Sequence, residues 1–347
     1  MIRTGERETS AAIGLFSLAP CFLVILHRSS QQSGAGAVFN ALLCAFLGFV
    51  ACIPASRYLK IFDGRSIISY IDRGWGRAIG VIISLLVFAY TAYSFNGYEG
   101  AVSAPESGFL ADDVKRGFLC VVAAVCACAG FEAVTRQGYM IMIVTVALSL
   151  IILVTVSAGI NTTNLYPILG NTAMQTMFNM DGTAVYSGIF VLPFLCNLIG
   201  DGEKSRRCLF RAYTLVALIT VFFVLLYALV VPYPLGLLFD FAPDALFASA
   251  SSGNILHRFE PFFITLMTVV ELITAGFGIC TASSILSVAS SFGDNRPFAL
   301  AYTLLLYYSG DILSSPAGYY AVCACFLFAG LAIPIVFLLF RKRILKN

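Results

Sequence analysis

The stretch ETSAAIGLFSLAPCFLVILH (residues 8–27) decides the fold. It is long and apolar enough to cross a bilayer, because a membrane-spanning helix needs about 20 mainly apolar residues. Pro20 stands in its middle, where a proline removes a backbone hydrogen bond and kinks or breaks a helix. A second stretch, TAVYSGIFVLPFLCNLIG (residues 183–200), carries Pro193 in its middle. The two prolines therefore mark corresponding positions in two membrane-spanning segments.

Interrupted helices at matching positions are the sequence pattern of transporters built from an inverted repeat. In such folds the freed backbone groups face a cavity near the middle of the membrane and bind a small ligand there. Gly14 lies before Pro20, and Gly188 and Gly200 lie on either side of Pro193, which favours an interruption in both segments. The alternative is that each proline only kinks its helix, because proline is common in membrane helices.

The composition extends the membrane assignment to the whole chain. Hydrophobic residues make up 59% of it and charged residues 11%, whereas soluble domains carry roughly 25% charged residues. We therefore predict an all-α polytopic membrane protein, with residues 1–347 forming a single transmembrane domain. Five spans in a first half (about 8–158) and five in a second half (about 182–340) would form the inverted repeat, with helices one and six broken. The predicted spans are residues 9–27, 35–56, 78–98, 117–131, 139–158, 182–200, 209–231, 259–288, 297–310 and 317–340.

The loops predict the orientation. Most of the 21 lysines and arginines fall in loops that share one side when both chain ends are placed in the cytoplasm, as the positive-inside rule requires. The net charge of +3 is small, and its basic residues are spread over short loops, which argues against a nucleic-acid surface. The eleven cysteines lie mostly in apolar runs without His or carboxylate neighbours at metal-ligand spacing, so we expect no metal site and no cofactor. Catalytic motifs are absent, and we expect no enzyme and no catalytic residues.

Glu271 is the one carboxylate deep within a predicted span. A charge at the bilayer centre costs roughly 2.5–3.5 kcal/mol on insertion scales, so such a residue usually faces a cavity or a partner. Thr268, Thr274 and Gly278 share its helix face at helical spacing. This face would line a pocket, or else Glu271 is a protonated acid bonded to a neighbouring helix.

The third span supplies Tyr90 and Ser94, which share a face at i, i+4 spacing. A buried tyrosine needs a partner for its hydroxyl. Tyr98, at the end of the predicted span, fits the interfacial aromatic belt better than Tyr90 does.

Three ordered motifs resemble those of one family. They are GFEAVTR at residues 130–136, NLYPILG at residues 164–170 and RFE at residues 258–260. In this order and at these helix positions, the chain resembles the B-subunit family of bacterial spore germination receptors. These proteins are permease-like members of the amino acid–polyamine–organocation superfamily.

The resemblance implies several expectations about the fold and its ligand. The ten-helix fold would have broken first and sixth helices and a ligand site between helices one, three, six and eight. A small-molecule germinant, commonly an amino acid, would bind there from the outer side and trigger germination. Carried onto this chain, the site residues are Ser17, Ala19, Pro20, Tyr90, Ser94, Phe190, Val191, Phe194, Glu271, Thr274 and Gly278.

The resemblance also implies partners and a location. The chain would assemble with a larger membrane A subunit and a lipoprotein C subunit in the spore inner membrane, as a multi-pass protein of the bacterial cell membrane. Two features depart from the family's pattern: the sixth span has no glutamate after its break, and FSLAP (residues 16–20) replaces a glycine-rich break in the first.

Two other functions compete with germinant sensing. The same fold serves secondary transporters of amino acids or related solutes, and the fold alone does not separate the two. Proton-coupled relatives often carry a lysine in helix five, where the span YMIMIVTVALSLIILVTVSA (residues 139–158) has no charged residue. That absence favours sensing. The lost acid in span six leaves a third alternative, a scaffold subunit with a degenerate pocket.

Overall fold

The computed structural model describes residues 5–20, 33–63, 66–67, 73–102, 112–168, 170, 172–236, 246, 260–310, 313 and 315–340. These residues form helices and the turns between them, and none of them is in a strand. The longer elements are α1 (Glu6–Pro20), α3 (Ala37–Ile61), α5 (Arg73–Val102), α6 (Asp112–Ala129), α7 (Phe131–Val156), η5 (Asp181–Val191) with α9 (Leu192–Ile199), α10 (Gly202–Val230), α13 (Glu260–Ser290), α14 (Arg296–Tyr308) and α15 (Pro316–Leu339). The short ones are η2 (Gly34–Gly36), η3 (Ser157–Gly159), η4 (Thr162–Leu165), α8 (Ala173–Phe178) and α11 (Tyr233–Gly236).

Each predicted span coincides in order with one of the longer elements, counting η5 and α9 as one. Within the described ranges, seven segments are long and apolar enough to cross a membrane. The described parts of α1 and α14 are shorter, at 15 and 13 residues, and α6 begins with the charged sequence DDVKR. The prediction of an all-helical membrane protein is therefore confirmed.

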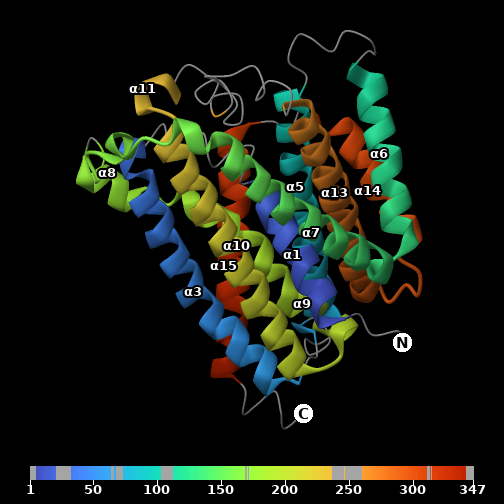
Figure 1. Cartoon of the computed structure of the whole chain (residues 1–347). Helices are drawn as coiled ribbons and strands as arrows, with labels where there is room; N and C mark the ends of the chain where they lie inside the picture. The colour runs from blue at the N-terminus through green and yellow to red at the C-terminus, as the bar shows by residue number, and fades with distance from the viewer. Residues whose placement is uncertain are drawn as a thin grey trace.

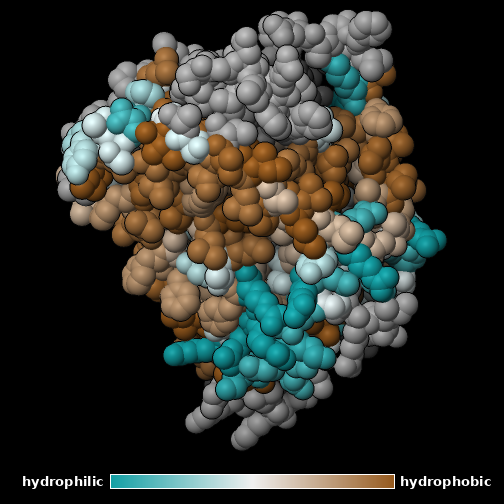
Figure 2. All heavy atoms as spheres, in the orientation of Figure 1, coloured by the Kyte–Doolittle hydropathy of each residue, from teal (hydrophilic) through white to brown (hydrophobic). Residues whose placement is uncertain are grey.

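The helices lie roughly side by side in a bundle (Figure 1). A band of hydrophobic residues crosses the face shown in Figure 2, and hydrophilic residues gather at its lower end, where α1 begins. Large apolar side chains such as Phe46, Phe118, Leu218 and Phe328 are exposed on the outer helices. An exposed apolar surface of this extent suits contact with lipid.

Burial separates interior helices from peripheral ones. Within their apolar windows, residues 176–199 are 83% buried and residues 264–290 are 72% buried, against 28% for residues 131–154 and for residues 317–339. In α1, every residue from Thr9 to Pro20 is buried. The interior of the bundle is therefore built by α1, η5 with α9, and α13, and the other helices surround them.

The sixth helix differs from the predicted break. It winds as a 3₁₀ helix to Val191 and continues as an α-helix from Leu192, whose backbone is right-handed helical and whose N–H donates to the carbonyl of Ile189. Pro193 lies in the first turn of α9, where a backbone N–H would have no partner within the helix in any case. The proline thus accompanies a change of winding and not an interruption. The first helix is described as far as Pro20, and residues 21–32 lie outside the described part of the chain.

Candidate functional site

The third and eighth helices, α5 and α13, are joined by polar contacts along their length. The hydroxyls of Tyr98 and Thr268 share a hydrogen bond at one end, and Ser84 donates to the carbonyl of Ala282 at 2.6 Å at the other. Residue numbers fall along α5 as they rise along α13, so the two helices are antiparallel. The predicted polar face of α13 therefore looks onto α5.

Glu271 lies between these two ends. Its side chain is buried, and Ser94 of α5 donates to its Oε1 at 3.0 Å. Within the described part of the chain, Glu271 is the only Asp, Glu, Lys, Arg or His in the buried class. A carboxyl group taken out of water needs hydrogen-bond donors, and Ser94 provides one.

Gly278 brings the two helices close together. A Cβ built on Gly278 would collide with Thr91, whose Cγ2 and Cβ would lie 2.8 and 2.9 Å away. Only a residue without a side chain fits there, and small residues are the usual means of close helix approach in membranes. Gly278 is thus packed against α5.

The first helix meets this pair through aromatic side chains. Tyr90 of α5 donates from its hydroxyl to the carbonyl of Phe16 at 3.2 Å. The ring of Phe16 lies with its centroid 4.8 Å from that of Tyr90 and 5.4 Å from that of Phe277. The expectation that Tyr90 is buried with a partner for its hydroxyl is confirmed.

The sixth helix closes the cluster from the other side. A Cβ on Gly188 of η5 would lie 2.6 Å from Ser17 Oγ and 3.2 Å from Ser17 Cα, so the backbones of the first and sixth helices nearly touch. On the opposite side of η5, Phe190 packs against Gly330 of α15, where a Cβ would collide with it. These contacts, together with the packing of α1 on α5 and α13, bring helices one, three, six and eight together.

All the residues predicted for the site are buried: Ser17, Ala19, Pro20, Tyr90, Ser94, Phe190, Val191, Phe194, Glu271, Thr274 and Gly278. Ser17, Tyr90, Ser94, Glu271 and Gly278 belong to the contacts above. Phe194 lies in α9, about one turn after Phe190, and Ser66 donates a hydrogen bond to its carbonyl at 3.0 Å. Ala19, Pro20 and Val191 take part as packed apolar residues. We name the convergence of α1, α5, η5 and α13 the central cluster.

Among the residues that the structure describes, two hydroxyls of the predicted site residues have no hydrogen-bond partner. They are Ser17 Oγ and Thr274 Oγ1, both fully shielded from solvent. A buried hydroxyl without a partner costs free energy, and the great majority of such groups in proteins are satisfied. Ser17 lies against Gly188 of η5, and Thr274 lies one turn from Glu271 on α13.

The tenth helix, α15, contributes residues that the sequence reasoning missed. Tyr319 and Phe326 stand 6.0 and 6.1 Å from Tyr90, measured between ring centroids. Together with Cys323 and Gly330 they have the spacing i, i+4, i+7, i+11 of one helix face. That spacing was a usable signal, although an aromatic face alone does not separate a site from ordinary packing.

Tyr98 corrects another prediction. It is buried and bonded to Thr268, so it does not belong to an interfacial belt. The apolar span ends at Tyr98 as predicted, while the helix α5 continues to Val102. Tyr98 therefore lies within the helix and faces α13.

Two of the family motifs lie where one helix connects to the next. Gly130 has φ +96° and precedes α7, and Glu132 pairs with Arg136 one turn later. Asn164 lies in η4, and its side chain donates to the carbonyl of Leu229 at 3.1 Å. Leu169 of the second motif, and Arg258 and Phe259 of the third, lie outside the described residues. The first two motifs thus fix connections between helices.

The fold and this cluster define a polytopic helical membrane protein with a polar group at the centre of its bundle. A family model of spore germination proteins, the spore permease family, matches residues 116–308, which is more than half of the chain. The chain belongs to this family and is a permease-like integral membrane protein related to germination. No curated protein matches the chain.

Proposed function

We propose that this chain is the germinant-sensing membrane subunit of a spore nutrient receptor and that a small solute such as an amino acid binds at the central cluster. The observation that carries the proposal is the buried Glu271, with the hydroxyl of Thr274 one turn away on α13 and that of Ser17 on the adjacent α1, both without a partner among the described residues. An amino acid has both the ammonium group that a carboxylate binds and further polar atoms for the hydroxyls.

The helix packing supports an inverted repeat of five plus five. The first half would be α1, α3, α5, α6 and α7, and the second η5 with α9, α10, α13, α14 and α15. If the two halves are equivalent, each contact between two helices should have a counterpart between the corresponding helices. The contact of α1 with α7 corresponds to that of η5 with α15, and the contact of α1 with α10 corresponds to that of η5 with α3. The contact of α7 with α13 corresponds to that of α15 with α5, and all six contacts are present. The pairs that map onto themselves, α1 with η5, α3 with α10, α5 with α13 and α6 with α14, are in contact as well. Such repeats place their ligand at the interface between them.

The winding of η5 supports a moving part at the same place. A 3₁₀ run longer than three or four residues is uncommon, and within a longer helix it often marks a functional hinge. η5 runs for 11 residues and passes Ser17 at Gly188. Ligand binding beside this contact would shift η5 relative to α1, and that shift would carry the signal to the partner subunits.

A secondary transporter of amino acids or related solutes is the second candidate, because Glu271 could also carry a coupled proton. Helix five argues against it. The hydroxyls of Thr145 and Ser149 on α7 are bonded to its own carbonyls at 2.9 and 2.7 Å, and the helix carries no charged residue from residue 137 onward. It therefore offers no cation for coupled transport.

The remaining parts of the proposal follow from the family. The chain would be a multi-pass protein of the spore inner membrane with both ends in the cytoplasm, and it would act with a larger membrane A subunit and a lipoprotein C subunit. Co-purification of the three from spore membranes tests the assembly separately from ligand binding.

Binding of amino acids to the purified chain in nanodiscs tests the sensing function, with Glu271→Gln as the variant and Glu203→Gln as the control. The control makes the same chemical change at an exposed site. An ionic hydrogen bond contributes about 1.5–3 kcal/mol, so Glu271→Gln should weaken binding by roughly 10- to 100-fold, while Glu203→Gln should not change it.

Three other outcomes would contradict the proposal. Equal affinity of wild type and Glu271→Gln would show that the carboxylate of Glu271 does not bind the ligand. Concentrative uptake by the chain alone in proteoliposomes would favour the transporter. The absence of both binding and uptake for a full amino acid panel would favour the scaffold.

A further inference from the structure

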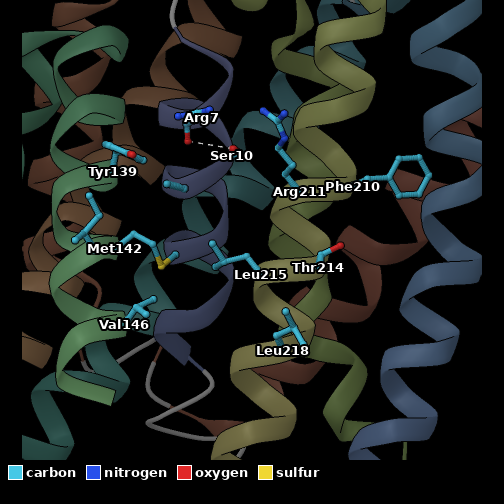
Figure 3. A pocket seen from close by; sticks show the side chains of 12 residues that line it. Arg7, Ser10, Tyr139, Met142, Val146, Phe210, Arg211, Thr214, Leu215 and Leu218 are labelled. Carbon is cyan, nitrogen blue, oxygen red and sulfur yellow. Dashed lines mark hydrogen bonds between the residues drawn. The ribbon is translucent and has the colours of Figure 1, made fainter. Parts of the chain in front are cut away.

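A groove lies between α1, α7 and α10, away from the central cluster. Its volume is about 680 Å³, which falls in the range of about 300–1,000 Å³ for small-molecule sites. Figure 3 shows the side chains that line it on the three helices; Leu215 points toward α1, whereas Phe210 extends toward α3. The lining residues are Arg7, Ser10, Ala11, Tyr139, Met142, Ile143, Val146, Phe210, Arg211, Thr214, Leu215 and Leu218.

The two walls have the same polarity along their length. On α10, Arg211 and Thr214 are followed by Leu215 and Leu218, and on α7, Tyr139 is followed by Met142, Ile143 and Val146. Each wall has the spacing i, i+3, i+4, i+7, which is one helix face. From Arg211 to Leu218 the helix rises about 10 Å, so the groove changes from polar to fully apolar over that length.

The polar end of the groove is the charged end of the bundle. Ion pairs join the beginnings of the three helices there: Glu6 of α1 lies 3.0 Å from Arg211 and 3.6 Å from Arg207 of α10, and Glu8 lies 4.0 Å from Arg136 of α7. The three helices therefore start at the same end of the bundle and run in the same direction.

This end carries surplus positive charge. Arg7 is exposed, and among the residues that the structure describes no carboxylate pairs with it. Arg207 and Arg211 share the single carboxylate of Glu6. Arg136 at the same end faces the carboxylates of Glu8 and Glu132, so four arginines stand against three carboxylates and one positive charge is in excess.

The floor of the groove is formed by α1. At Gly14, a Cβ would lie 3.1 Å from Leu215 Cδ2 and 3.3 Å from Met142 Cε, so these two side chains meet over the first helix. The outer wall is open: Leu218 is 67% exposed and Ile143 51% exposed. A ligand would enter from the membrane and not from water.

We propose that this groove binds an anionic phospholipid, with its phosphate at Arg7 and Arg211 and an acyl chain along Met142, Val146, Leu215 and Leu218. The occupant must combine an anion with a hydrocarbon chain in the order in which the groove changes from charged to apolar. A soluble phosphate would leave the apolar length uncovered, and a neutral lipid would leave the surplus positive charge unused. A bound lipid would tie the start of α1 to α7 and α10.

Lipid retention tests the proposal on the purified full chain. Native mass spectrometry of the protein titrated with phosphatidylglycerol or phosphatidylcholine gives the ratio of the two apparent affinities. A basic residue near an anionic lipid surface contributes about 1 kcal/mol, so Arg7→Gln should lower the preference for phosphatidylglycerol about five-fold. Arg296→Gln is the matched control, since Arg296 is another exposed arginine, at the start of α14 and outside the groove.

A second pair of variants tests the apolar length. Thr214→Trp places a bulky ring in the groove from an exposed position, and it should lower retention of both lipids. Leu225→Trp lies on the same face of α10 three turns further on, outside the groove, and should lower neither. Each variant is first checked for an unchanged melting temperature, and the exposed position of Arg7 keeps at least one variant folded.

Several results would overturn the proposal. One is equal retention of phosphatidylglycerol and phosphatidylcholine by the wild type, and another is an equal effect of Arg7→Gln and Arg296→Gln. Displacement of the lipid by millimolar inorganic phosphate would point to a simple anion site. Failure of the wild type to retain any lipid would show that the groove is not a lipid site, and a helix of a partner protein would then be its occupant.

Discussion

The first helix takes part in two sites of opposite character. In the central cluster, Phe16 and Ser17 are fully buried among rings and backbones in close contact. In the groove, Arg7, Ser10 and Ala11 of the same helix face two amphipathic walls. The central cluster is stabilised by close packing of buried side chains. The groove is exposed on its outer side and is bordered by charged residues at one end.

This difference teaches where each kind of change should act. A close-packed interior transmits strain, because added or removed atoms cannot be absorbed. Exposed ion pairs are screened and tolerate substitution. Variants in the central cluster should therefore change the stability of the bundle, and variants at the groove should change lipid selectivity with little loss of stability.

The largest effect is expected for Gly278→Ala. The new Cβ would collide with Thr91 and push α5 and α13 apart, which should lower the free energy of unfolding by about 3 kcal/mol, measured as a loss of melting temperature of the purified chain. Adding Thr91→Gly to the Gly278→Ala variant removes the colliding atoms and should restore part of the lost stability. Gly117→Ala is the control, because its Cβ would meet only Tyr307 at an ordinary 3.8 Å. Equal melting temperatures for Gly278→Ala and Gly117→Ala would show that the helices do not cross this closely.

The next effect separates the two kinds of hydroxyl in the central cluster. Ser94→Ala removes the donor to Glu271 and should cost about 2 kcal/mol of stability, because the buried carboxyl loses a partner. In Thr274→Val the new side chain has the same shape as threonine and lacks a hydroxyl that has no partner among the described residues, so stability should be unchanged or slightly higher. Thermal melting measures both. An added amino acid that binds should raise the melting temperature, and this rise should be smaller for Thr274→Val than for the wild type. An equal rise in both would mean that Thr274 does not contact the ligand.

Much of the fold followed from the sequence. The order of the long helices was predicted from apolar length, and Glu271 was found because a carboxylate in an apolar run is conspicuous. The helical spacing of Thr268, Glu271 and Gly278 placed them on one face, and that face does pack on α5. These signals are local, so a single sequence contains them.

What the sequence did not reveal depends on tertiary packing. The winding of η5 was missed because Pro193 is compatible with a break, a kink or the first turn of a new helix. Tyr319 and Phe326 were missed because an aromatic face on α15 looks like ordinary packing until Tyr90 is placed against it. The close approach at Gly278 needs the crossing point of two helices, which no local pattern gives.

A smaller loss is expected for Tyr90→Phe. The substitution keeps the ring contacts with Phe16, Tyr319 and Phe326 and removes the hydroxyl, which bonds the carbonyl of Phe16 and also contacts Ser187 and Tyr319, so the cost should be about 1 kcal/mol. Tyr308→Phe removes a hydroxyl from a side chain that is 73% exposed and should be neutral. If the two variants melt alike, the bond between α1 and α5 does not stabilise the bundle.

The smallest change in stability is expected at the groove, for Glu6→Gln. For this variant the direction of the change in lipid preference is also informative. Loss of the ion pairs with Arg207 and Arg211 should cost about 0.5 kcal/mol, because these arginines are half exposed and the attraction is screened. The same change leaves both arginines without a carboxylate, so the preference for phosphatidylglycerol over phosphatidylcholine should rise by up to about five-fold. Arg7→Gln should move the preference in the opposite direction. If Glu6→Gln lowered it instead, Glu6 would act by holding the arginines in place for the lipid, and the groove would depend on fitted shape as the central cluster does.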